Sequence, residues 1–231
     1  MADETTAPVW RRAFKEREFL AFSVLMFVGK SFLLVRLPYR DVDVNALYTS
    51  LMLLAFYLYF RFRYKVKPPL VIVFFLGAAV AVDVMGNFFQ LYGREFGPVE
   101  YDEFSHFLGS GLSLPPAMWL LRATTRRFGV SLPLDLLAFL SVTITFSFCS
   151  YYEILELWDE VYFGGKRLWT PTDSANDLQC DLAGIIAAAF ISVAVFKLLD
   201  RRGAVAGGRG AGARDANRDF DLLESDSVKR V

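Results

Sequence analysis

The hydrophobic positions of this 231-residue chain fall in six long runs rather than in amphipathic stripes. The runs cover residues 19–35, 46–60, 70–92, 103–121, 132–155 and 178–199. A helix that crosses a bilayer needs about 20 mostly apolar residues. The run 46–60 spans only ~22 Å as a helix, so it needs its flanking Tyr and Arg residues to complete a crossing. The pattern predicts an all-α, polytopic integral membrane protein, built as a bundle of six transmembrane helices.

The polar ends of the chain set the predicted domain boundaries. Residues 1–18 are polar, basic and aromatic, which is typical of a cytoplasmic segment that lies at the membrane interface. Residues 201–231 begin with a stretch rich in Gly, Ala and Arg and show no apolar periodicity, so they predict a disordered cytoplasmic tail. Residues 19–200 between them are predicted to form the six-helix transmembrane domain.

Composition agrees with a membrane location. The chain is 55% hydrophobic and 16% aromatic, and its mean hydropathy is +0.36, which is too apolar for an ordinary soluble domain. Lys plus Arg and Asp plus Glu balance at 25 each, so net charge predicts no nucleic-acid partner. The predicted partner is the lipid bilayer, and the pattern leaves the oligomeric state open.

The distribution of Lys and Arg predicts the orientation. Most loop Lys and Arg residues precede the first run, separate the second from the third and the fourth from the fifth, or follow the sixth. Cytoplasmic loops of membrane proteins carry this excess of positive charge. We therefore expect a multi-pass protein of the cell (inner or plasma) membrane with both termini in the cytoplasm.

The ionisable residues of the runs gather at one predicted level, near the outer surface. They are Asp102 and His106 at the start of the fourth run, Glu153 and Glu156 at the end of the fifth, and Asp177 and Asp181 at the start of the sixth. Asp83 and Asn87 of the third run lie in the outer half of the predicted bilayer, and Lys30 lies near its middle. Charge is costly in hydrocarbon, so these side chains should face the bundle interior, where Lys30 and Asp83 form one plausible structural pair.

Carboxylates that converge with one imidazole suit a divalent metal ion such as zinc, manganese or iron. The predicted metal ligands are Asp102, His106, Glu153, Asp177 and Asp181. Paired carboxylates beside His106 would equally suit proton transfer, with His106, Glu153, Glu156, Asp177 and Asp181 as the catalytic candidates. The structural alternative is that acids at helix starts act only as caps and that the single His is a packing residue.

Three motifs resemble a known family. YDEFSHF at 101–107, YEILELWDE at 152–160 and TDSANDLQCDLAG at 172–184 are similar to the YjdF-like inner-membrane proteins and, more distantly, to the VanZ-like membrane proteins. In both, an acid precedes a His-Phe pair at a helix start, and a Glu-rich helix end follows. The resemblance implies a compact six-helix membrane protein and implies no particular reaction.

Three functions fit the sequence. The first is a membrane protein with an outward-facing acidic and His pocket that binds a metal ion, a lipid headgroup or a small molecule, as an enzyme on envelope or lipid substrates would. The second is a small proton- or cation-coupled transporter that uses Asp83 and Lys30, and the third is a structural or assembly protein. The inner half of the bundle has almost no polar residues, which favours an enzyme or a binding protein over a transporter.

Overall fold

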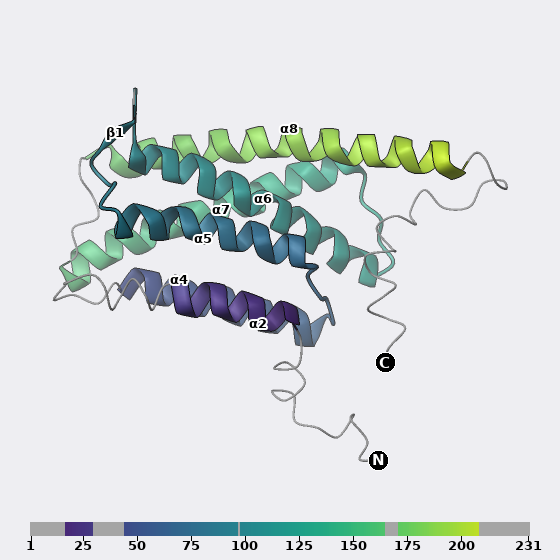
Figure 1. Ribbon diagram of the computed structural model, residues 1–231, viewed down its shortest axis with the longest axis horizontal. Coiled ribbons are helices and arrows are strands. Elements are labelled where there is room, and N and C mark those ends of the chain that lie inside the picture. The colour runs from purple at the N-terminus through teal and green to yellow at the C-terminus, as the bar shows by residue number, and fades with distance from the viewer. Residues whose placement is uncertain (1–16, 30–43, 97, 165–170, 208–231) are drawn as a thin grey trace, which may run out of the picture.

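The computed structural model describes residues 17–29, 44–96, 98–164 and 171–207 (Figure 1), with the side chains of 27, 44–50, 96 and 199–207 left undescribed. The helices are α2 (Arg17–Ser23) with its π-helical continuation η2 (Val24–Val28), α4 (Val44–Arg63), α5 (Leu70–Phe88), α6 (Tyr101–Arg127), α7 (Leu134–Trp158) with its π-helical continuation η3 (Asp159–Phe163), and α8 (Asp173–Gly207). The strands β1 (Glu95–Phe96) and β2 (Val99–Glu100) pair antiparallel just before α6.

The predicted helical membrane architecture is confirmed at the level of its class. Among the described residues, three helices are long and apolar enough to cross a bilayer: Leu70–Phe88, Leu134–Phe163 and Asp173–Leu198. The α5 and α7 helices begin directly after Pro69 and Pro133, whose extended backbone sets the first helical residue. The count of six crossings stays a prediction.

The helices extend beyond the hydrophobic runs from which they were predicted. The α8 helix begins at Asp173, before the run 178–199, and continues past Asp200 to Gly207. The α7 helix continues as a π-helix to Phe163, and the chain then turns at Gly164, whose φ of 75° is left-handed. Polar residues at the ends of a helix can be helical without being part of a hydrophobic run. Helix bounds predicted from hydropathy are therefore too short.

The α6 helix lies at the centre of the bundle and packs against α5, α7 and α8. Its contact with α7 and α8 is an apolar core formed by Leu114, Met118, Leu137, Ala138 and Ile185. Leu114 and Ile185 are completely buried there. A smaller core of Phe22, Met26 and Val73 joins α2 and η2 to α5, with α4 packed alongside.

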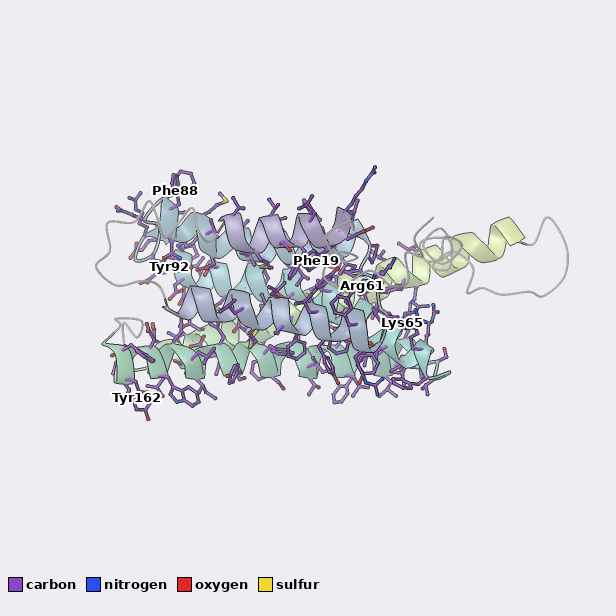
Figure 2. All side chains as sticks on the ribbon, turned by 90° about the horizontal axis from the view of Figure 1, so that it is seen from below. Phe19, Arg61, Lys65, Phe88, Tyr92 and Tyr162 are labelled. Carbon is purple, nitrogen blue, oxygen red and sulfur yellow. The ribbon has the colours of Figure 1, made fainter. Side chains whose placement is uncertain are left out.

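The two ends of the bundle differ in charge. Figure 2 shows Arg61 and Lys65 at one end, and Tyr92 and Tyr162 at the other. In Figure 1, the second end is where α5 and α7 finish and where β1, α6 and α8 start. This end holds the polar residues that the sequence placed at one level.

Candidate metal centre

The start of α6 presents Asp102 and His106 on one helix face. A reciprocal capping box fixes its first turn: the Glu100 backbone N–H donates to Glu103 Oε2 at 3.0 Å, and the Glu103 backbone N–H donates to the Glu100 side chain. The acids of this turn also lie at the positive end of the helix dipole. Asp102 and His106 are four residues apart, so they point to the same side.

The ends of α7 and α8 bring three carboxylates to that side. Asp177 and Asp181 are one turn apart near the start of α8, and Glu153 lies about 7 Å before the end of α7. These three side chains are nearly completely removed from solvent, with 3%, 3% and 4% of each residue exposed for Asp177, Asp181 and Glu153.

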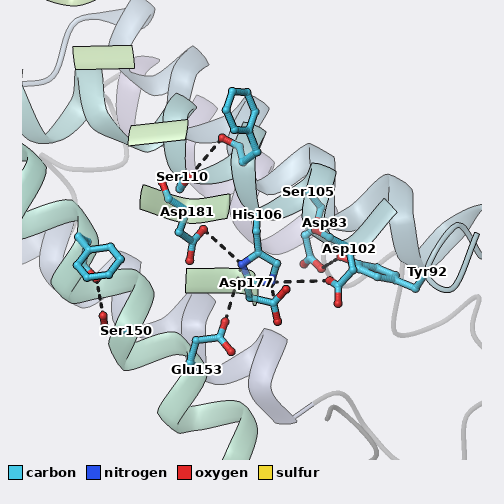
Figure 3. Close-up of polar contacts among 12 residues, drawn as sticks. Asp83, Tyr92, Asp102, Ser105, His106, Ser110, Ser150, Glu153, Asp177 and Asp181 are labelled. Atoms are coloured by element: carbon cyan, nitrogen blue, oxygen red, sulfur yellow. Dashed lines mark hydrogen bonds and ion pairs between the residues drawn. The ribbon is translucent and has the colours of Figure 1, made fainter. Parts of the chain in front are cut away.

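The four carboxylates surround the imidazole of His106 (Figure 3). Its Nδ1 atom lies 3.3 Å from Asp181 Oδ1 and 3.8 Å from Glu153 Oε1. Its Nε2 atom lies 3.7 Å from Asp102 Oδ1 and 3.9 Å from Asp177 Oδ2. Each ring nitrogen therefore faces two carboxylates.

These contacts define two groups with metal-ligand spacing. The Nδ1 group consists of His106, Glu153 and Asp181, and the Nε2 group consists of Asp102, His106 and Asp177. Within each group the potential ligand atoms all lie within 4.8 Å of one another. Three protein ligands leave coordination positions open, as in catalytic rather than structural metal sites.

Glu153 is the least satisfied of these carboxylates. Both of its carboxylate oxygens are buried and accept no hydrogen bond from any described residue. The side chain of Ser174 is the nearby donor, but it lies outside the distance and angle range of a hydrogen bond to this carboxylate. A buried carboxylate without donors is costly, because its lost hydration is not replaced.

A close contact between α6 and α8 sets the distance from His106 to Asp181. The Ser110 hydroxyl donates to the backbone carbonyl of Asp181 at 3.0 Å. One turn further along α8, Gly184 packs directly on the backbone carbonyl of Phe107, and a Cβ at position 184 would overlap that oxygen. The absence of a side chain at Gly184 thus lets the two ligand-bearing helices approach each other.

A second polar group lies beside the first. Asp83 Oδ1 on α5 accepts hydrogen bonds from Asn87 Nδ2 at 2.9 Å and from the Tyr92 hydroxyl at 3.0 Å. Burial raises the pKa of Tyr92 well above its ordinary range, and the charge of Asp83 adds to this effect. Tyr92 is therefore a neutral donor. The ring of Tyr101 packs beside it, and the Tyr101 hydroxyl donates to the Val82 carbonyl.

The structure assembles most of the residues that the sequence put forward. It brings Asp102, His106, Glu153, Asp177 and Asp181 together. Glu156 is buried on α7 but belongs to neither group. Asp83 and Asn87 form their own pair on α5. The predicted partner Lys30 lies outside the described residues.

Sequence reasoning missed Tyr92 and Ser110, and it gave Gly184 only as the last residue of the third motif, without its contact. Tyr92 is the last residue of the hydrophobic run 70–92 and looks like an interface aromatic, so nothing in its local sequence links it to Asp83. The one available signal for Gly184 was its position at the end of the third quoted motif. Nothing in the sequence around Ser110 indicated its contact with α8.

The family of the chain follows from comparison with known proteins. The sequence profile of a family described as "Predicted membrane protein (DUF2238)" matches residues 19–201. The chain belongs to this family. Searches of curated proteins and of solved structures found no match. The matched range contains α6, α7 and the first 29 residues of α8, so the metal-ligand geometry lies wholly inside the family region.

Carboxylates dominate this cluster, and its donor atoms are of a kind that could hold a cation. The four carboxylates have ion-pair contacts with His106 and with no other described basic side chain. Carboxylates at such short range repel one another unless protons or a cation compensate for their charge. Carboxylate oxygens with one imidazole nitrogen form the mixed donor set that zinc, manganese and iron accept.

Proposed function

We propose that this membrane protein binds a divalent metal ion between α6, α7 and α8, with the Nδ1 group of His106, Glu153 and Asp181 as its first ligands. The observation that carries the proposal is Glu153. Its carboxylate is buried, turned toward Nδ1 of His106, and without a hydrogen-bond donor among the described residues. A carboxylate held in this way gains a partner when a cation binds beside it.

The charge balance supports a cation over a purely structural role. A structural network would give each buried acid its own donor. Here one imidazole serves four carboxylates in the described part of the chain. A helix cap would also leave its carboxylate near backbone N–H groups, whereas Glu153 lies near the end of α7 and cannot cap its start.

The placement of the centre in the membrane follows the loop charges. We propose six crossings with both termini in the cytoplasm, supported by the run pattern and by the Arg and Lys residues at the opposite end of the bundle (Figure 2). On this orientation the centre opens toward the outer face of the cell membrane. The YjdF-like resemblance is consistent with the family match over residues 19–201. We further propose a distant relationship to the VanZ-like proteins, which rests on the sequence motifs alone.

The activity that suits such a centre is metal-dependent binding or hydrolysis of an envelope or lipid substrate. Three protein ligands leave room for a water molecule or a polar headgroup. Glu156, which is buried on α7 three residues after Glu153, is the further acid that we assign to proton exchange with such a ligand. The buried polar residues described further along α7, Ser141 and Thr145, are uncharged, which disfavours a charged path across the membrane.

Metal analysis of the full-length protein tests the proposal. The protein is purified in detergent, stripped with a chelator, equilibrated with Zn²⁺ or Mn²⁺, and analysed by elemental mass spectrometry. We expect at least one ion per chain in the wild type and a large loss in His106→Ala and Glu153→Ala.

Asp135→Asn is the matched control, because Asp135 is an exposed acid at the start of α7, far from the centre. It should retain the wild-type metal content. If the wild type and the three variants all contain the same amount of metal, well below one ion per chain, the proposed metal-binding function is wrong.

A further inference from the structure

The two ring nitrogens of His106 face two different pairs of carboxylates. Nδ1 faces Glu153 and Asp181, and Nε2 faces Asp102 and Asp177. The lone pairs of the two nitrogens in an imidazole point away from each other across the ring. One ion bound to Nδ1 therefore cannot also be coordinated at Nε2, and a single ion uses only part of this cluster.

We propose that the centre is dinuclear, with the imidazole of His106 bridging one divalent ion in the Nδ1 group and a second in the Nε2 group. The second position, formed by Asp102, His106 and Asp177, is the new site. This inference rests on the proposed function, because it requires that the Nδ1 group binds metal. It goes beyond it by assigning a second ion and a bridging role to His106.

The distances fit ions at both positions. Ligand atoms at about 2.0–2.2 Å from one ion lie roughly 3.3–3.6 Å apart in a tetrahedral coordination shell. Asp181 Oδ1 is already 3.3 Å from Nδ1. The other three carboxylates lie 3.7 to 3.9 Å from their nitrogens. A side-chain movement of about 0.5 Å closes this difference, which rotation about the carboxylate torsions allows.

Asp177 provides an independent reason to place an ion at the Nε2 group. Its side chain is only 4% exposed, and its one ion pair or hydrogen bond in the described structure is the 3.9 Å contact with Nε2. Asp177 is therefore buried and aimed into this position. Asp102 is more accessible, with 21% of its side chain exposed, and gives the second ion a route from the surface.

The formal charges favour two ions over one. Four carboxylates carry −4, so one divalent ion beside a neutral His106 leaves −2. When two divalent ions bind, the remaining N–H proton of the imidazole passes to solvent. Four carboxylates and one imidazolate then carry −5, and two ions reduce this to −1. The smaller residual charge matters because the three carboxylates of Glu153, Asp177 and Asp181 are shielded from water.

The stoichiometry of Zn²⁺ binding tests the proposal in the full-length protein. After removal of metal with a chelator, equilibrium dialysis against ZnCl₂ should give two Zn²⁺ per chain in the wild type. Asp177→Asn and Asp102→Asn should each reduce this to one, and Asp181→Asn should also leave one. The control Asp135→Asn should keep two. Circular dichroism and gel filtration verify that each variant is folded.

Electron paramagnetic resonance with Cu²⁺ tests the bridge itself. An imidazolate couples the spins of two Cu²⁺ ions, so the signal at two Cu²⁺ per chain should integrate to much less than the total copper. In Asp177→Asn with one Cu²⁺ per chain, the signal should recover the full copper content.

The outcomes separate the two proposals. Zero Zn²⁺ in the wild type overturns both the metal-binding function and the dinuclear centre. One Zn²⁺ in the wild type keeps the function and overturns the second site; Asp102 and Asp177 would then hold the Nε2–H of a histidine that binds one ion. Two Cu²⁺ with full, uncoupled signal overturn the bridging role of His106.

Discussion

The contact of α6 with α7 and α8 contains two regions that are chemically opposite, one apolar and one polar. Around Leu114, Met118 and Ile185 the helices meet through apolar side chains that fill the space between them. Toward the starts of α6 and α8 the same helices meet through His106 and its carboxylates. The apolar side chains need no hydrogen-bond partner, whereas the polar region holds the buried carboxylate of Glu153, which lacks a donor among the described residues. We therefore expect stability to depend mainly on the first region and the proposed metal binding on the second.

The largest change in stability is expected from a mutation that creates a cavity in the apolar region. Leu114→Ala removes a completely buried side chain, and we expect it to lower the free energy of unfolding by about 2–5 kcal/mol, because its packing contacts are lost. Unfolding of the purified protein by SDS titration in mixed micelles measures this. Phe190→Ala on α8 is the control, since 74% of Phe190 is exposed and it should unfold nearly as the wild type does. Equal losses in both variants would contradict the assignment of the core.

A change at the boundary of the two regions should affect both of them. Gly184→Ala places a Cβ against the Phe107 carbonyl, so α6 and α8 must separate, at a cost of about 1–3 kcal/mol in stability. Metal affinity should fall as well, because Asp181 moves away from His106. Gly109→Ala is the matched control: its Cβ would meet only the Ala79 carbonyl oxygen, at 4.0 Å. Retention of full metal binding by Gly184→Ala would argue against the role of this contact.

A mutation in the polar region should change the stability of the metal-free protein in the opposite direction and increase it. Glu153→Gln removes a buried charge that lacks donors, so the metal-free variant should be more stable than the metal-free wild type by about 1–3 kcal/mol. With Zn²⁺ present the order should reverse, because the wild type gains the binding energy. Thermal unfolding with and without chelator gives both values. A variant that is destabilised under both conditions would show that Glu153 is structural.

The smallest effect is expected at the neighbouring Asp83 group. Tyr92→Phe removes the hydroxyl that donates to Asp83 at 3.0 Å, and we expect a loss of about 0.5–1.5 kcal/mol. Tyr162→Phe is the comparison, because 72% of Tyr162 is exposed and the loss of its hydroxyl should be nearly neutral. Unchanged Zn²⁺ content in Tyr92→Phe would separate this group from the metal centre.

The sequence predicted the class of fold and the members of the cluster for one reason: both depend on position along a helix. Hydrophobic runs predict helices, and helices with alternating directions bring Asp102, Glu153 and Asp177 to one end of the bundle. The spacing of Asp177 and Asp181 is itself sufficient to place them on one face.

The details of the centre depend on packing, which the sequence pattern does not contain. That Nδ1 faces Glu153 while Nε2 faces Asp102 follows from the rotation of α6 against its neighbours. The contact that fixes this rotation involves Gly184, and a single glycine in an apolar run carries no signal of what it touches. Glu156 is a second example. Its spacing of three residues from Glu153 made it a candidate, but it belongs to neither group.

The distribution of the ligands over three helices has a consequence for biosynthesis. His106 and Glu153 are synthesised with α6 and α7, while Asp177 and Asp181 follow only with α8, the last of the described helices. The ribosome thus delivers the imidazole before two of the acids that surround it. If the proposed metal binding holds, metal uptake has to wait for α8, and a nascent chain arrested before Asp173 would have its apolar α6–α7 contact but would lack two of the proposed ligands.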